Sequence, residues 1–180
     1  MSRARALAAL TGAAAAAALA VPATSATAAP VAPRVAHLTV DQLINACKNA
    51  PVPSGSTQAR AMFLKLQCVR RKAGLPLWTS NDGIAKVAAK WSAHMAATGV
   101  LAHNANRDAQ VKAAHPGAGN IAEIVAFTSA KTNRTATLLA IWMHSSTHRA
   151  IILDARYHVA GVGLAVGHGS VWGTVDYSTG

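Results

Sequence analysis

The sequence predicts an α+β domain in which helices come first and paired strands come last. Apolar residues recur at helical spacing in several segments between residues 57 and 149. Near the C-terminus the period changes, because residues 159–166 and 171–177 are rich in β-branched residues and glycine. Residues 167–170, between these two segments, are typical of a hairpin turn. This order of elements argues against a parallel βαβ fold.

The N-terminal segment has the features of an export signal. Arg3 and Arg5 precede an almost unbroken apolar run over residues 6–21, and residues 26–28 supply the small-x-small pattern that signal peptidase requires. The run is shorter than the roughly 20 residues that cross a bilayer. We therefore expect residues 1–28 to be a secretory signal peptide that is cleaved near Ala28. The mature chain would then be secreted and have no transmembrane segment; an uncleaved N-terminal anchor is the alternative.

The chain is strongly basic, with 17 Lys and Arg against six Asp and Glu and a formal net charge of +11. Removal of a signal that contains Arg3 and Arg5 would leave 15 basic and six acidic residues, in a chain long enough for one domain with its own core. Such a surface favours anionic envelope polymers or lipid headgroups as partners, or serves only solubility. Export argues against nucleic acid as a physiological partner. We expect a monomer.

The elements of the mature chain can be predicted in order. Residues 29–56 are expected to be an N-terminal linker rich in Ala, Val and Pro, with a short helix over residues 38–50. Residues 57–180 are expected to form the domain, and its first helix begins at an N-cap on Thr57 and ends near Ala73. The second helix of the domain is expected to begin at an N-cap on Ser80 or Asp82.

The middle of the chain is less regular. Residues 101–119 are polar and contain His and Gly, which predicts a long loop. Residues 120–127 fit either a strand or a helix, and residues 135–149 are predicted to be one helix.

Cys47 and Cys68 are the two cysteines of the chain. In an oxidising compartment an even number of cysteines favours one disulfide over two free thiols. This disulfide would link the N-terminal segment to the helix that contains Cys68.

Four segments, in this order and spacing, resemble the bacterial secreted branch of the CAP superfamily (cysteine-rich secretory protein, antigen 5 and pathogenesis-related protein), also called the SCP-like domain. No segment is specific alone, but together they cover about 120 residues from Gln58 onward. The resemblance implies a three-layer α-β-α sandwich around a small antiparallel sheet. The segments are Arg70 with Gly74-Leu75-Pro76-Leu77, residues 88–103, Gly119-Asn120-Ile121-Ala122, and residues 142–163, which begin Trp-Met-His-Ser-Ser-Thr-His-Arg.

The resemblance also implies a cleft that is lined by two histidines and two acidic residues and can bind a divalent metal. The histidines correspond to His103 and His148. The acidic positions fall on Gly119 and Ser145, so neither family carboxylate stands where the alignment places it. Glu123 is the candidate to replace the first of them.

These residues define the expected site. Asn120 is expected in the cleft wall, with Glu123 and Ser145 as accessory residues beside the histidine pair. Neutral imidazoles are good zinc ligands, so we expect His103 and His148 to bind Zn²⁺ weakly, with no cofactor required. No residue is expected to be catalytic.

Three functions fit the sequence. The leading hypothesis is a secreted binding module without established enzymatic turnover, whose ligand is a small lipid or an envelope or other extracellular macromolecule. A metal-assisted hydrolase that uses the same histidines, with Glu123 as base, is the alternative. A structural envelope protein held by its basic face is the third. A zinc-peptidase helix is not supported, because His144 and His148 lack the Glu of the HExxH motif.

Overall fold

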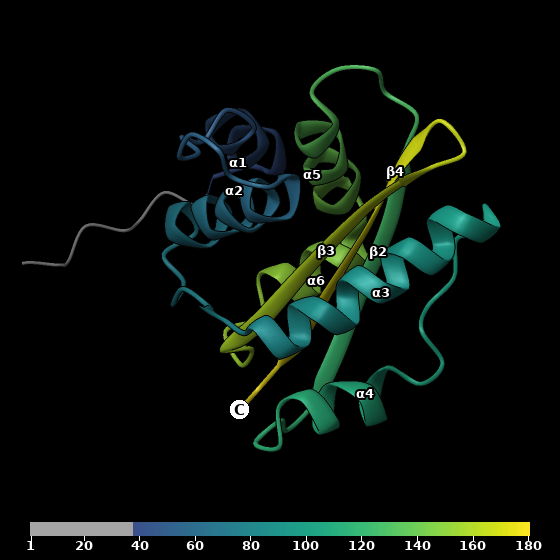
Figure 1. The fold of residues 1–180 in the computed structure, drawn as a ribbon. Helices are drawn as coiled ribbons and strands as arrows, with labels where there is room; N and C mark the ends of the chain where they lie inside the picture. The colour runs from purple at the N-terminus through teal and green to yellow at the C-terminus, as the bar shows by residue number, and fades with distance from the viewer. Residues whose placement is uncertain (1–37) are drawn as a thin grey trace, which may run out of the picture. The chain divides into compact units, whose positions relative to one another are not determined.

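The computed structural model describes residues 38–180 of the chain. The predicted signal peptide, its cleavage site and residues 29–37 of the linker lie outside the described residues. The helices and strands are those drawn in Figure 1: α1 (Val40–Cys47), α2 (Gln58–Lys72), β1 (Thr79–Ser80), α3 (Asp82–Thr98), α4 (Arg107–Ala114), β2 (Ile121–Thr128), α5 (Arg134–His144), α6 (Ser146–Ile152), β3 (Val159–Gly167) and β4 (Ser170–Ser178).

The four strands form one sheet in the order β1-β3-β4-β2. The central strand, β4, pairs antiparallel with β3 on one side and with β2 on the other. The short β1 pairs parallel with the start of β3 through Thr79 and Ser80 alone, so the sheet is mixed where an antiparallel one was expected. The predicted hairpin at residues 167–170 connects β3 and β4 and is confirmed.

Helices cover both faces of this sheet, and the predicted three-layer α+β sandwich is confirmed (Figure 1). One layer contains α3 and α4. The other contains α1, α2, α5 and α6, and it buries the largest core cluster against side chains such as Ile124, Val175 and Tyr177. Within residues 38–180, no helix is both long enough and apolar enough to cross a membrane.

Glycines let α3 lie directly on the backbone of β3. A Cβ atom on Gly161 would collide with the backbone of α3 at Ala85, and one on Gly163 would collide at Ala89. Ser92 of α3 also donates a hydrogen bond from its hydroxyl group directly to the carbonyl oxygen of Gly163, at 2.9 Å. The glycine-rich strand therefore permits an unusually close contact between helix and sheet.

Arg70, in the first of the four matched segments, is a buried structural residue. It is fully buried and donates hydrogen bonds to four backbone carbonyl groups, at Pro76, Ile152, Asp154 and Tyr157, at distances of 2.7–3.4 Å. Its guanidinium also lies 4.4 Å from the ring centroid of Trp78. Arg70 thus joins the end of α2 to the segments that follow α2 and α6.

Several helix boundaries differ from the prediction. Asn81 caps α3 by accepting a hydrogen bond from the Ile84 N–H, so the prediction of Ser80 or Asp82 was wrong. The predicted single helix over residues 135–149 is also wrong, because Ser145 adopts an extended conformation that separates α5 from α6. The predicted loop over residues 101–119 contains α4, and the ambiguous segment 120–127 lies mostly in strand β2.

The expected disulfide between Cys47 and Cys68 is confirmed and links α1 to α2. Cys47 is fully buried in the main core cluster, and Cys68 packs against that cluster. The bond therefore holds α1 on the domain.

Replacing both cysteines by alanine should lower the free energy of unfolding by about 3 kcal/mol. The two cysteines are 21 residues apart, and a loop of this length restricts the unfolded chain by about that amount. Urea denaturation of the oxidised wild type and of the double variant measures the difference. Adding a reductant to the wild type should produce a similar loss, and equal stability of the oxidised and reduced forms would contradict this prediction.

Candidate functional site

His103 and Glu123 form a direct pair at the surface of the α3–α4 layer. His103 Nδ1 lies 2.7 Å from Glu123 Oε1, and the side chain of His103 is 59% exposed whereas that of Glu123 is 0% exposed. A carboxylate can only accept at this contact, so Nδ1 carries the proton and donates it. The other ring nitrogen, Nε2, is then free to accept a proton or bind a ligand.

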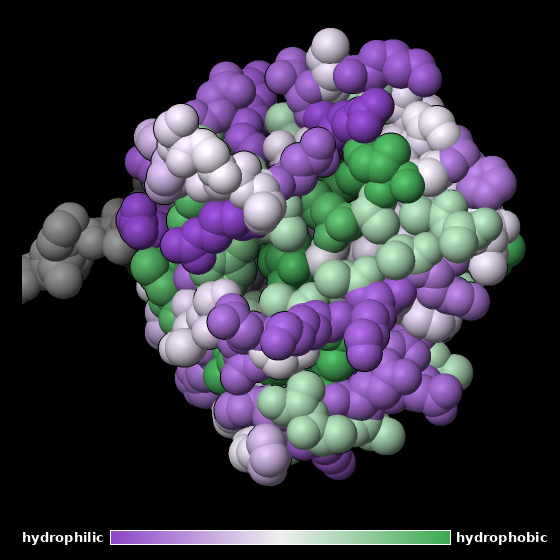
Figure 2. Space-filling view, viewed as in Figure 1, coloured by the Kyte–Doolittle hydropathy of each residue, from purple (hydrophilic) through white to green (hydrophobic). Residues whose placement is uncertain are grey.

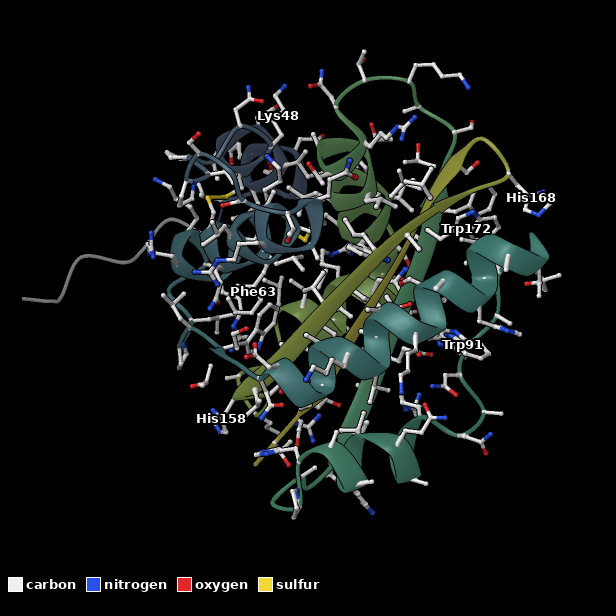
Figure 3. All side chains as sticks on the ribbon, viewed as in Figure 1. Lys48, Phe63, Trp91, His158, His168 and Trp172 are labelled. Carbon is white, nitrogen blue, oxygen red and sulfur yellow. A yellow bond between two sulfur atoms is a disulfide. The ribbon has the colours of Figure 1, made fainter. Side chains whose placement is uncertain are left out.

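The loop that carries His103 is fixed on both sides of that residue. Trp91 of α3, labelled in Figure 3, donates from Nε1 to the carbonyl oxygen of Ala102 at 2.8 Å. The backbone N–H of Asn104 donates to Glu123 Oε1 at 3.0 Å, and the Asn104 side chain donates to Gln110 of α4. His103 is therefore held between α3, α4 and β2.

A second buried carboxyl group lies beside Glu123. Asp176 of β4 stands opposite Glu123 of β2 in the strand register, so both side chains point to the α3–α4 face of the sheet. Burial, together with the negative charge of Glu123, raises the pKa of Asp176 to about 8. Asp176 is thus protonated at neutral pH, while Glu123 accepts two hydrogen bonds.

His148 approaches this pair from α6. Burial, and then the charge of His103, lower the pKa of His148. Its Nδ1 atom is buried and has no hydrogen-bond partner among residues 38–180. His148 is therefore neutral at pH 7 and lies near enough to His103 to be affected by its charge.

The two other expected site residues have local structural contacts. Ser145 is the N-cap of α6, and its side chain accepts from the backbone N–H of His148 at 3.5 Å, so it positions the turn that carries this histidine. Asn120 is bound through its backbone to Thr179 next to the C-terminal end of β4. Within the described part of the chain, neither side chain has a hydrogen bond to the side chain of His103, Glu123 or His148.

Glu123 is the residue that was expected to replace the first missing family carboxylate. It lies within β2, and its Oε1 atom is in contact with His103.

Asp176 and Asn104 were missed in the sequence analysis. Asp176 lies between Val175 and Tyr177 in a strand whose residues are all buried, and an acidic residue inside such an apolar segment is the signal that could have identified it. Asn104 had no comparable signal, because its role depends on contacts formed only in the folded loop.

The site and fold define a class of α-β-α domain with a carboxylate-supported histidine at the surface of its sheet. Residues 65–177 match the family described as CAP, the cysteine-rich secretory protein family. The chain belongs to this family. No curated protein gives a significant match.

Solved structures with this fold come from several bacteria. An extracellular protein containing an SCP domain from Bacillus anthracis is 20% identical, with a TM-score of 0.56, over 67% of this chain and 40% of that one. A cysteine-rich secretory protein from Staphylococcus aureus is 21% identical, with a TM-score of 0.54, over 72% of this chain and 40% of that one. An outer surface protein from Borrelia burgdorferi is 13% identical, with a TM-score of 0.59, over 67% of this chain and 91% of that one. The matches therefore span less than half of the first two proteins, and at these identities they establish the fold alone.

Proposed function

We propose that this chain is a secreted CAP-domain binding module and that its ligand is bound at the His103–Glu123 pair with His148 beside it. The observation that carries the proposal is the contact between an exposed imidazole and a fully buried carboxylate. This arrangement fixes the tautomer of His103 and leaves Nε2 directed to a partner. The ligand classes that suit the site and the basic surface are a divalent cation, a small lipid and an anionic envelope polymer.

A divalent metal fits this site only weakly. His103 through Nε2 and His148 would hold the ion, and a bound Zn²⁺ would supply Lewis-acid character there. Glu123 is engaged by His103 and Asn104, so it supports a ligand rather than acting as one. Within residues 38–180 no three His, Cys, Asp or Glu side chains are grouped to hold a metal, so water or the bound partner would complete the coordination.

A hydrolase is less well supported by the geometry. A general base must reach the water or hydroxyl whose proton it removes. The Glu123 side chain is fully buried, and Oε1 already accepts two hydrogen bonds. Asp176 is protonated at neutral pH and fully buried. Each carboxyl group therefore orients other residues instead of facing a substrate.

Export is part of this proposal. The structural relatives include an extracellular protein and an outer surface protein, and the Cys47–Cys68 disulfide suits an oxidising compartment. Cleavage near Ala28 would release the domain from its signal.

We expect the labelled chain to be recovered from the medium. N-terminal sequencing of that chain should show that it begins after Ala28.

Zinc should raise the melting temperature of the wild type and should not raise that of the variant His103→Ala/His148→Ala. A ligand at 100 times its Kd stabilises the folded state by about 2.7 kcal/mol, which corresponds to a shift of several degrees. The shift should decrease as the pH falls through the histidine range, because protonated imidazole does not bind metal. Differential scanning fluorimetry over a zinc titration measures it.

The matched control removes two histidines from elsewhere on the surface. His94→Ala/His158→Ala also deletes two imidazoles, both at exposed positions, one on α3 and one before β3, and should retain the full wild-type response. An unchanged zinc shift in the His103/His148 variant, or no shift in the wild type, would reject metal binding at this site.

A further inference from the structure

The outer edge of β3 has no neighbouring strand over most of its length, and it reaches the surface at residues 164–167, whereas residues 160–163 are buried. β1 covers this edge through its pairing with Val159 and Ala160 alone, whereas β4 pairs with all of β3 on the opposite side. The edge from residue 161 to residue 167 therefore has no neighbouring strand in the described structure. It lies at the side of the sheet remote from β2 and from the His103–Glu123 pair.

Three residues direct their backbone groups to the open side. The carbonyl oxygen of Ala160 accepts from the Asn81 N–H on the β1 side. Hydrogen-bonding direction alternates along a strand, so Val162, Leu164 and Val166 present their N–H and C=O groups to the same side. Within residues 38–180, no loop or side chain forms a hydrogen bond with these groups.

The surface part of this edge, residues 164–167, lacks the side chains that usually prevent strand addition. Natural edges are protected by proline, by charged side chains or by a covering element, and β3 contains neither proline nor a charged residue. Val166 is 64% exposed. Figure 2 shows the surface on this side, where a green apolar strip runs between the purple surfaces of the two helical layers.

A cavity marks the position that a longer β1 would occupy. It has a volume of about 180 Å³ and lies just beyond the end of β1, between α2 and α3, where Phe63 and Val162 contribute apolar surface and Arg60 and Asp82 contribute charge. It can take a side chain of a strand added in line with β1.

We propose that β3 is a docking edge that binds an extended peptide segment of a partner protein by strand addition. This surface is separate from the site of the proposed function. On the α3 side the added strand needs small residues, as β3 does at Gly161 and Gly163. On the α2 side it needs branched apolar residues to meet Val162, Leu164 and Val166. Acidic ends suit the secreted chain, in which 15 basic residues would outnumber six acidic ones, and the same excess of positive charge disfavours a second copy as the occupant.

The probe is the synthetic peptide acetyl-Glu-Val-Ala-Val-Ala-Val-Glu-amide, titrated against the full secreted chain by isothermal titration calorimetry. Two derivatives carry N-methyl groups, one on the valines and the other on the alanines. Strand addition uses the N–H groups of one edge of the peptide, so one derivative should lose binding and the other should retain it. Equal affinity of the parent and both derivatives would overturn the proposal, as would equal loss by both or no binding of the parent.

The matched protein variants are Leu164→Pro and Leu164→Val. Proline removes the outward N–H of Leu164 and leaves the bonds between β3 and β4 in place, because these involve the alternate residues. We expect Leu164→Pro to raise the Kd roughly tenfold, and Leu164→Val to change it less than about threefold. Circular dichroism checks that both variants are folded, and the pair of N-methylated peptides tests the edge even if proline disturbs it.

Analytical ultracentrifugation separates this proposal from self-association. A monomer over the concentration range of the titration is expected. A dimer that is lost in Leu164→Pro would overturn the proposal, because a second copy of the chain would then occupy the edge. Neither result depends on His103 or His148, so failure here is distinct from failure of the zinc experiment.

Discussion

Gly163→Ala should destabilise the domain by about 3 kcal/mol or more. The added methyl group would collide with the backbone of α3 at Ala89, and a helix backbone cannot move aside as a flexible side chain can. Relief requires α3 to move away from β3, which would also stretch the hydrogen bond from Ser92 to Gly163. Overpacked cores typically lose 1–3 kcal/mol, and this lost hydrogen bond adds to that cost. Urea denaturation measures the change.

The control for this substitution is Gly117→Ala. Gly117 is exposed, and the nearest atom to an added Cβ, in His115, would be 3.9 Å away. The same chemical change should therefore alter the free energy of unfolding by less than about 0.5 kcal/mol. Similar losses in the two variants would show that the close contact between α3 and β3 does not determine the effect.

Asp176→Asn should stabilise the protein at neutral pH by an amount on the order of 3 kcal/mol. The folded state raises the pKa of Asp176 from 3.8 to about 8, so between these values the folded chain holds a proton that the unfolded chain has released. Raising the pH through this window therefore favours unfolding and lowers the stability of the wild type. Asparagine keeps the neutral shape of the protonated acid and does not titrate.

The pH dependence provides the test. The stabilities of the wild type and of Asp176→Asn should converge near pH 4 and separate steadily up to pH 8, beyond which the difference should stay constant. The control is Asp82→Asn at an exposed position, which should leave the slope of the wild type unchanged. Parallel pH profiles for wild type and Asp176→Asn would contradict a protonated Asp176.

Local signals explain which parts of the fold were predictable. Thr57 caps α2 as predicted, because a cap depends on residues three positions apart, and the hairpin between β3 and β4 depends on adjacent turn residues. The break at Ser145 was missed because Ser145 caps α6 inside a continuous helical pattern. Helix α4 was missed because Val111 is its one buried residue.

Part of the candidate site was also predictable from the sequence. The family resemblance selected His103, and Glu123 was the candidate to replace a missing family carboxylate; the structure brings these two residues into contact. The protonation state of Asp176 could not be predicted from the sequence, because its pKa depends on burial in the folded sheet and on the charge of Glu123, which pairs with it from a distant segment. The open edge of β3 was equally hidden, since it follows from the shortness of β1 and from the strand order.

The position of β4 has a consequence for biosynthesis. Among residues 38–180 it is the last strand, and it is the central one in the sheet, buried along its whole length. Until residues 170–178 have been made, β2 and β3 have no common partner and cannot form one sheet. We therefore expect that a nascent chain cannot complete the fold before these residues have been synthesised. A stop codon that removes β4 should yield a protease-sensitive polypeptide instead of a smaller domain.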